Sequence, residues 1–321
     1  MSASDPKLAA DALLGLRIYE RAPRRDPALQ KPEIGRTRGA SLRDHGGTGP
    51  PIVFIPSLIN PPRILDLDGE VSLTAAIAAL GRHVMLVDWG KADERSDLSV
   101  AGHVEELLLP LLRSIGRPVT LIGYCLGGTM AIAAANLLET EAVVTLAAPW
   151  YFSRYPEASH AALRQMWEHS KSAAKSLGAL PMEVLQAAFW SLDPERTVRK
   201  FAEFGRLGPS SAESRRFVEL EEWANDGEPL PFASASELVE DLFGADLPGN
   251  GSWRVGEMAV SDDLAVPLLN LTAQRDLIAP PQTAALGLTR AIDSGHVGMI
   301  VGSARARLHE ELRNFLLREK P

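Results

Sequence analysis

Short apolar runs alternate with amphipathic stretches along most of this chain. Runs suited to buried strands occupy residues 52–55, 83–87, 119–122 and 142–146, and apolar positions at helical spacing occupy 72–80, 104–115 and 125–138. The alternation returns towards the C-terminus, with apolar runs at 267–271 and 297–301 and an amphipathic helix at 304–317. Strands that alternate with helices through short connections predict a mostly parallel sheet with helices on both faces.

Two segments interrupt this alternation. Residues 1–50 contain one amphipathic stretch at 8–19 and then a region rich in Arg, Pro, Gly and Asp, which predicts a surface helix followed by a polar strap. Residues 150–255 are predicted to form helices broken by prolines, and they hold fourteen of the nineteen aromatic residues. Aromatic side chains at this density serve a packed helical insertion, an apolar lid over a site, or both. The expected division is an N-terminal helix and strap at 1–50, a core at 51–149 and 256–321, and a helical lid insertion at 150–255.

Composition narrows the range of partners. The chain has 321 residues, of which 45% are hydrophobic and 23% charged, so a sizeable core is expected and a disordered chain is excluded. The formal net charge is −8, which has the wrong sign for general attraction to nucleic acid. A single cysteine excludes an internal disulfide and a multi-thiolate metal site, and it favours a cytoplasmic location. The longest apolar runs are about half of the ~20 residues that a membrane-spanning helix needs, so no membrane span is expected.

The single cysteine lies in the most informative motif of the chain. Cys125 is the third residue of GYCLGG at 123–128, directly after the apolar run at 119–122 and before a helix of small residues. This order of strand, sharp turn and helix is that of a nucleophile elbow, with Cys in the place usually held by Ser. The helix N-terminus favours the thiolate, and together with the Leu126 N–H it would stabilise an oxyanion. The competing interpretation is a buried, unreactive cysteine in a Gly-rich turn.

Such an elbow predicts an acid and then a histidine later in the chain. Asp276 follows the apolar run at 267–271, and His296 lies in a Gly-flanked turn, SGHVG at 294–298. The competing interpretation of Asp276 is a turn or a helix cap. His309 falls among charged neighbours in the closing helix, where a solvated side chain is the better interpretation.

Three other aspartates are weaker candidates for the acid. Asp293 is only three residues from His296, and Asp262 and Asp263 precede the run at 267–271, at the wrong end of the predicted strand. Asp276 therefore remains the acid that we expect in the site.

The loop after the first apolar run supplies the second expected oxyanion donor. In folds with this elbow a backbone N–H comes from that loop, here PSLIN at 56–60, and we assign it to Leu58 or Ile59. Tyr124, next to the nucleophile, either lines the site or packs the elbow, and the sequence leaves both roles open. The residues DWG at 88–90 end the next strand, and a strand-terminating turn is their simplest interpretation.

These motifs resemble those of the polyhydroxyalkanoate synthases and their short synthase-like relatives in the α/β-hydrolase superfamily. The resemblance begins near residue 14 and is carried by five motifs in order: PSLIN at 56–60 with ILDL at 64–67, VDWG at 87–90, GYCLGG at 123–128, DLIAP at 276–280 and SGHVG at 294–298. It implies an α/β-hydrolase fold and a catalytic triad of Cys125, Asp276 and His296. It also implies a homodimer and an acyl-CoA substrate, usually a 3-hydroxyacyl-CoA, with no cofactor. The shortest synthases need a second subunit, so such a subunit and a polyester granule surface are further implied partners.

The expected activity is acyl transfer from CoA to a hydroxyl through a thioester on Cys125. Exchange of one thioester for another is nearly balanced in free energy, so the acyl group stays available for transfer. His296 would then activate the acceptor hydroxyl, with Asp276 fixing its tautomer. Two alternatives stay open: a thioesterase or polyester hydrolase, in which water is the acceptor, and a catalytically silent synthase subunit or granule-associated protein. The complete set of three residues argues against the silent protein.

Overall fold

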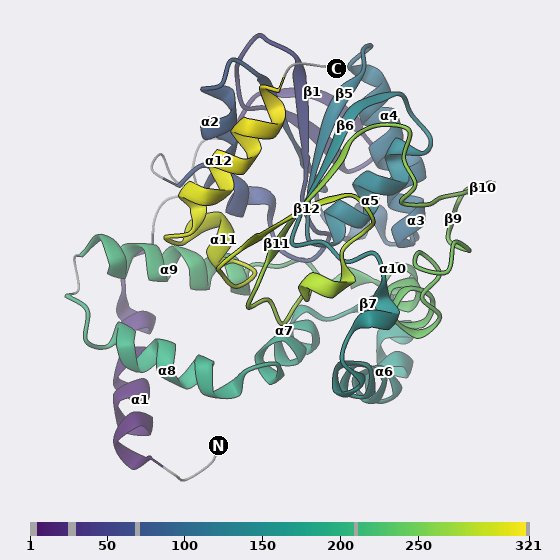
Figure 1. The fold of residues 1–321 in the computed structure, drawn as a ribbon. Coiled ribbons are helices and arrows are strands. Elements are labelled where there is room, and N and C mark those ends of the chain that lie inside the picture. Colours follow the sequence, from purple (N-terminus) through teal and green to yellow (C-terminus); the bar gives the residue numbers. More distant parts are fainter. Residues whose placement is uncertain (1–4, 25–29, 68–70, 209–210, 319–321) are drawn as a thin grey trace. The chain divides into compact units, whose positions relative to one another are not determined.

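The computed structural model describes residues 5–24, 30–67, 71–208 and 211–318 (Figure 1). The chain forms two compact units. The larger one, the sheet unit, comprises Lys31–Met182 and Glu228–Pro321, and the smaller one, the helical unit, comprises Met1–Gln30 and Glu183–Gly227. Among the helices that lie in the described ranges, none is long and apolar enough to cross a membrane.

The sheet unit is built on eight strands in the order β1-β2-β4-β3-β5-β6-β11-β12. β2 pairs antiparallel with both β1 and β4, and the other neighbouring strands are parallel. The strands are β1 (Glu33–Thr37), β2 (Ala40–Asp44), β3 (Pro51–Ile55), β4 (His83–Asp88), β5 (Val119–Tyr124), β6 (Thr140–Leu146), β11 (Leu268–Ala273) and β12 (Leu288–Ile292). β3 and β5 are buried along their whole length, as parallel strands covered on both faces must be. The prediction of a mostly parallel sheet is confirmed.

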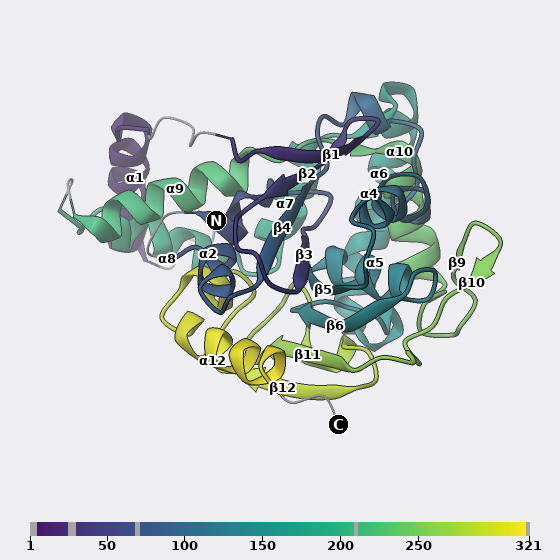
Figure 2. The ribbon, with the colours of Figure 1, turned by 90° about the horizontal axis from the view of Figure 1, so that it is seen from above.

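Helices cover both faces of this sheet, as predicted. α2 (Leu73–Ala78) and α12 (Arg305–Leu316) lie on one face, and α4 (Leu109–Ser114) and α5 (Leu126–Ala135) lie on the other (Figure 1 and Figure 2). α3 (Val100–Gly102) continues into α4 through a π-helical turn, His103–Leu108. Further short elements of this unit are α10 (Phe232–Ser236), α11 (Gly298–Val301), a second π-helical turn (Glu237–Gly244), 3-10 turns (Pro62–Asp66, Asp93–Arg95, Phe152–Arg154, Pro281–Thr283) and the strands β7 (Ala179–Leu180), β8 (Leu230–Pro231), β9 (Arg254–Val255) and β10 (Met258–Ala259).

The segment predicted as a polar strap contains β1 and β2, so that prediction is wrong for residues 33–44. β2 pairs with β4 and buries Ala40, Ser41 and Leu42. Within β2 only these three residues are buried, and Arg43 and Asp44 preserve the polar composition that the sequence shows. A strand this short leaves no alternating pattern, so composition alone indicated a loop.

The apolar run at 297–301 was expected to form a strand, and this prediction is also wrong. Gly298–Val301 is the helix α11, which buries Met299, Ile300 and Val301. A short apolar run has the same composition in a buried helix as in a buried strand, so the pattern cannot separate the two. β11 has β6 on one side and the edge strand β12 on the other. Only Ile292 within β12 is buried, so this strand contains no apolar run.

The insertion at 150–255 is divided between the two units. α6 (Glu157–Leu177) and α10 belong to the sheet unit, where aromatic side chains of the insertion pack on one another. The Phe243 ring lies 4.9 Å from that of Phe152 and 4.7 Å from that of Tyr155, measured between centroids. The Trp150 and Trp253 rings lie 6.0 Å apart. Core packing therefore explains part of the aromatic concentration.

The helical unit contains α1 (Pro6–Arg21), α8 (Pro194–Phe204) and α9 (Ala212–Asn225), and α7 (Met182–Ser191) begins at its boundary. The N-terminal helix is confirmed: Asp5 caps it by accepting from the Lys7 and Leu8 N–H groups, and Pro6 occupies the first turn. α1 packs closely on α8. A Cβ at Gly15 would lie 1.9 Å from the Phe201 carbonyl oxygen, so only glycine fits at this crossing.

Candidate active site

Cys125 occupies a sharp turn between β5 and α5. Its backbone has φ 54° and ψ −130°, a strained conformation for a residue with a side chain. The turn is held at both ends, because the Cys125 N–H donates to the Leu146 carbonyl (3.0 Å) and the Cys125 carbonyl accepts from the Gly128 N–H (2.8 Å). The thiol is half-buried. The half-buried thiol is therefore fixed at the carboxyl end of β5, directly before a helix N-terminus.

Glycines allow this turn to approach its surroundings. A Cβ at Gly127 would lie 2.1 Å from the Ile55 carbonyl oxygen at the end of β3, and a Cβ at Gly123 would lie 2.4 Å from the Gly128 Cα. Both distances are far shorter than a side chain tolerates. A larger residue at either position would push α5 away from the sheet, and the first turn of α5 therefore lies against the start of the loop that follows β3.

The sheet register brings the carboxyl ends of β5, β6, β11 and β12 to one edge. Asp276 lies three residues beyond the end of β11, and His296 lies four residues beyond the end of β12. A hydrogen bond from the Arg275 N–H to the Ser294 carbonyl (2.8 Å) ties these two loops together. Parallel strands thus deliver three chemically distinct side chains to the same edge of the sheet.

His296 connects the carboxylate to the thiol. Its Nδ1 lies 2.6 Å from Asp276 Oδ2, and the residues are 8% and 4% exposed. The other Asp276 oxygen accepts from the Ile278 and Ala279 N–H groups at 2.8 and 2.9 Å. Cys125 is near enough to His296 to affect the protonation of its ring. The structure therefore pairs His296 with Asp276 and places Cys125 near this pair.

The charges in this group favour a protonated imidazole. Burial opposes protonation of His296, but the negative charges of Asp276 and Cys125 and the hydrogen bonds to both outweigh it and raise the pKa of His296. A protonated imidazole stabilises a nearby cysteine as the thiolate, which is its nucleophilic form.

Two tyrosines border the group. The Tyr124 ring lies 5.0 Å from the His296 ring, and its O–H donates to the His296 carbonyl (3.5 Å), so Tyr124 lines the site and packs the elbow at once. Tyr155 was not singled out in the sequence, where it is one aromatic residue among many. Its O–H donates to the Ile278 carbonyl (2.9 Å), in the loop that holds Asp276. Burial and then the nearby negative charges raise the pKa of both phenols, which stay neutral.

The three predicted oxyanion donors lie around the elbow. Leu126 is the first residue of α5, so its N–H has no acceptor within the helix. Leu58 and Ile59 are buried in the loop after β3, whose first residues are in contact with Gly127. The Ile59 N–H makes a long hydrogen bond to Ser57 Oγ (3.4 Å).

Two of the weaker acid candidates, Asp293 and Asp262, have other partners. Asp293 is exposed and pairs with Arg275. Asp262 accepts from the Leu286 N–H (2.7 Å). Neither of these two carboxylates is hydrogen-bonded to His296 in the part of the chain that the structure describes.

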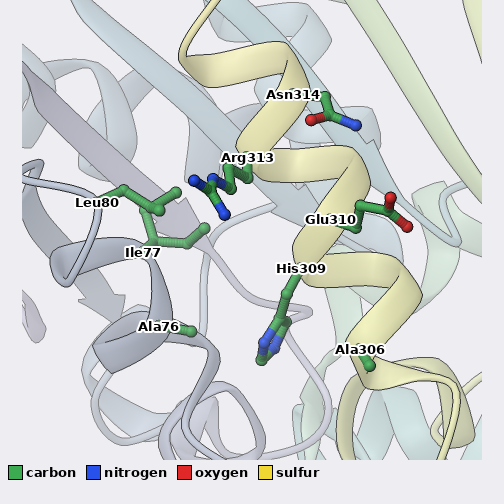
Figure 3. A pocket seen from close by; sticks show the side chains of 8 residues that line it. All are labelled: Ala76, Ile77, Leu80, Ala306, His309, Glu310, Arg313 and Asn314. Carbon is green, nitrogen blue, oxygen red and sulfur yellow. The ribbon is translucent and has the colours of Figure 1, made fainter.

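A separate pocket of about 400 Å³ lies between α2 and α12 (Figure 3). Its lining contains none of the residues above and consists of Ala76, Ile77, Leu80, Ala306, His309, Glu310, Arg313 and Asn314. The sequence suggests a solvated His309, but the side chain is half-buried here. Burial and then the charge of Arg305 lower the pKa of His309, and its Nε2 has no hydrogen-bond partner among the described residues.

Known proteins match both the sequence and the fold. The family model described as "Alpha/beta hydrolase family" matches residues 45–310. The poly(3-hydroxyalkanoate) polymerase subunit PhaC of Haloarcula marismortui is 26% identical over 83% of this chain, which spans 60% of that relative's length. The subunit of the same name from Allochromatium vinosum is 25% identical over 83% of this chain and 80% of its own. Among solved structures, epoxide hydrolase A from Mycobacterium thermoresistibile superposes with a TM-score of 0.54 and 19% identity over 89% of this chain and 97% of its own, which shows the fold.

Proposed function

Since the chain belongs to the α/β-hydrolase family, we propose that it is an acyltransferase of the polyhydroxyalkanoate-synthase type, which moves a 3-hydroxyacyl group from CoA through Cys125 to a hydroxyl. The observation that carries the proposal is the half-buried cysteine at the elbow, near a histidine that Asp276 holds at 2.6 Å. The similarity to PhaC subunits supports a synthase-type role over water-dependent chemistry.

The first step transfers the acyl group to the enzyme. The Cys125 thiolate attacks the thioester carbonyl, the bond between the acyl carbon and the CoA sulfur breaks, and the departing CoA thiolate takes the proton from His296. The Leu126 N–H, with that of Leu58 or Ile59, would bind the oxyanion that forms on the way. Donors of this kind stabilise the transition state by about 3–4 kcal/mol.

The second step transfers the acyl group to the acceptor. The acceptor hydroxyl gives its proton to His296 as its oxygen attacks the acyl carbon, and the bond from that carbon to the Cys125 sulfur breaks. This step creates an imidazolium from a neutral imidazole, and the adjacent Asp276 carboxylate stabilises it. The requirement for Asp276 is therefore greater here than in the first step.

We also propose a lid, a cellular location and partners for this site. The parts of the insertion that belong to the sheet unit, 150–182 and 228–255, act as a lid that excludes water. The protein works in the cytoplasm as a homodimer or with a second synthase subunit at a polyester granule surface. The lid rests on the concentration of aromatic residues, and the packing of Phe152, Tyr155 and Phe243 in the sheet unit supports it. The location rests on the single cysteine, and the partners rest on the resemblance to the synthases.

The test uses 3-hydroxybutyryl-CoA. We expect the protein to release CoA and to form an ester or polymer, and Cys125→Ala to release none. The acyl product is identified by mass spectrometry as polymer, ester or free acid. Free acid as the sole product would replace transfer with hydrolysis, and CoA release that survives in Cys125→Ala would remove the nucleophile from the proposal.

A further inference from the structure

The loop at 56–59 is held through its carbonyl groups by donors from distant segments. These hydrogen bonds are Trp89 Nε1 to the Pro56 carbonyl (3.1 Å), Arg95 Nη2 to the Leu58 carbonyl (3.5 Å) and the Glu228 N–H to the Ile59 carbonyl (3.2 Å). In a trans peptide the carbonyl and the following N–H point in opposite directions. A donor that holds a carbonyl of this loop therefore also directs the next N–H away from itself.

Arg95 differs from the other two donors because it is charged and buried. It is 1% exposed, and its Nη1 lies 3.0 Å from Nε2 of His103, which is fully buried. The Nδ1 of His103 lies 2.7 Å from the Ser99 carbonyl, which only accepts, so Nδ1 carries the proton and Nε2 accepts from Arg95. Burial, assisted by the charge of Arg95, lowers the pKa of His103 to about 3. The imidazole is therefore neutral.

The guanidinium keeps its full charge in this environment. Burial lowers the pKa of Arg95 to about 10, with the carboxylates of Glu228 and Asp88 opposing the change, so Arg95 stays protonated at neutral pH. Its Nε has no hydrogen-bond partner within the described residues. A buried charge with so few partners destabilises a fold relative to an apolar side chain of similar size. Packing alone does not explain an arginine at this position.

The loop that Arg95 holds adjoins the elbow. A Cβ at Gly127 would lie 2.1 Å from the Ile55 carbonyl oxygen and 2.6 Å from that of Pro56. Movement of the loop would therefore displace the backbone of the elbow beside Cys125. A charged donor on the Leu58 carbonyl also polarises the peptide group between Leu58 and Ile59, which makes its N–H a stronger donor.

We propose that Arg95, held by His103, is a positioning residue that fixes the 56–59 loop as an oxyanion site for acyl chemistry at Cys125. Arg95 acts through the loop and does not touch the acyl group. The inference rests on the proposed function in one respect, namely that Cys125 accepts an acyl group. It requires neither CoA nor a particular acceptor.

Two reactions of the same thiol separate this role from a merely structural one. Acylation of Cys125 by p-nitrophenyl butyrate builds an oxyanion, whereas alkylation by iodoacetamide is a displacement at a saturated carbon and builds none. Cys125 is the one cysteine in the sequence, so the rate that Cys125→Ala lacks in each reaction is the rate of this thiol. We expect Arg95→Gln to slow acylation by about 10- to 100-fold, less than the loss of a direct oxyanion donor. Alkylation, and its pH profile, should stay within about twofold of the parent protein.

Trp89→Phe and Trp253→Phe form a matched pair. The first removes the donor to the Pro56 carbonyl, and the second removes an equally buried indole that donates to Glu237 (2.7 Å), away from the loop. Only Trp89→Phe should lower the ratio of acylation to alkylation, by several-fold. Arg95→Lys keeps the charge and one donor, so it should recover part of the ratio, and it replaces Arg95→Gln if that variant does not fold.

Arg95→Gln that acylates at the parent rate would overturn the inference, as would an equal loss of both reactions in Arg95→Gln and Arg95→Lys. A parent protein that the ester acylates but that releases no CoA from 3-hydroxybutyryl-CoA would contradict the proposed function instead. The lowered ratio in Arg95→Gln would then still support the role of Arg95.

Discussion

The surroundings of two buried histidines, His296 and His103, give them different charges, since one ring is protonated and the other is neutral. His296 lies 2.6 Å from the Asp276 carboxylate and its pKa is raised, whereas His103 lies 3.0 Å from the Arg95 guanidinium and its pKa is lowered to about 3. Burial opposes protonation in both places. A carboxylate partner therefore overcomes the effect of burial at His296, whereas burial, with the charge of Arg95 added to it, keeps His103 neutral.

The difference in protonation gives the two histidines different roles. A ring that holds a proton between a carboxylate and a thiol can give that proton to a leaving group and take one from an acceptor. A ring that cannot be protonated serves as a fixed acceptor for Arg95. The contrast between a transferable proton and a fixed hydrogen bond can be tested from either side.

Removal of the carboxylate beside His296 should have the largest effect. Asp276→Asn should slow transfer to the acceptor by up to about 10⁴-fold, because the imidazolium formed in that step loses its counter-charge. Acylation of Cys125 should fall much less, because a thiol needs less help than a hydroxyl to lose its proton. Rapid-quench measurements with labelled 3-hydroxybutyryl-CoA give the protein-bound acyl group and the product separately.

Asp293→Asn is the control for this variant, because Asp293 is an exposed carboxylate on the loop of His296 that pairs with Arg275. It should leave both steps nearly unchanged. Equal loss of both steps in Asp276→Asn would contradict the division of labour between the two partners of His296.

On the other side of the comparison, His103→Leu should be strongly destabilising. The substitution removes the acceptor of a buried charge, and breaking a buried charged contact costs about 3–5 kcal/mol. The free energy of unfolding from urea titration measures the loss. His103→Gln, which retains a side-chain acceptor, should recover a large part of it. His169→Leu is the control, since His169 is exposed on α6. Parental stability in His103→Leu would mean that Arg95 does not depend on this contact.

The two histidines should also affect stability on opposite sides of pH 6.5. The unfolded chain binds a proton at His103 below pH 6.5 and the folded protein does not until about pH 3. Stability therefore decreases as pH is lowered across this range, by about 1.4 kcal/mol per pH unit. The pKa of His296 is raised, so its contribution is complete below pH 6.5 and is lost as pH rises towards the folded value. Urea unfolding between pH 4.5 and 9 should show His103→Gln flattening the acid limb and His296→Gln flattening the alkaline limb. An unchanged acid limb in His103→Gln would show that His103 is not held neutral.

The sequence predicted one of these histidines and not the other, for a physical reason. His296 lies in a loop after a strand, in the order that the elbow requires, and the structure places it with Cys125 and Asp276 at one edge of the sheet. His103 begins an apolar helical stretch, where neither spacing nor neighbours indicate a charged partner. Its contact with Arg95 depends on how a 3-10 turn packs on a π-helical turn, which local patterns do not encode.

The fold was predictable to a similar degree. Buried parallel strands such as β3 and β5 are continuous apolar runs, and the sequence shows them directly. The edge strand β12 and the antiparallel pair β1–β2 are short and largely polar, and so their pattern is that of loops. Tertiary pairing makes these segments strands, and pairing partners are not visible in one sequence.

The smallest expected effect concerns the hydrogen bonds that surround His296. Tyr155 donates to the Ile278 carbonyl at 2.9 Å, and the Ile278 N–H in turn donates to Asp276, whereas Tyr124 donates to the His296 carbonyl at 3.5 Å. Tyr155→Phe should therefore lower the free energy of unfolding by about 1 kcal/mol, the usual net worth of a buried hydrogen bond, and Tyr124→Phe by less. Because the phenol orders the loop of Asp276, Tyr155→Phe should also slow acyl transfer by a few fold while leaving acylation of Cys125 intact. Both variants keep the aromatic ring, so a larger loss in Tyr124→Phe than in Tyr155→Phe would show that the hydroxyl beside the imidazole, rather than the carboxylate loop, sets the position of His296.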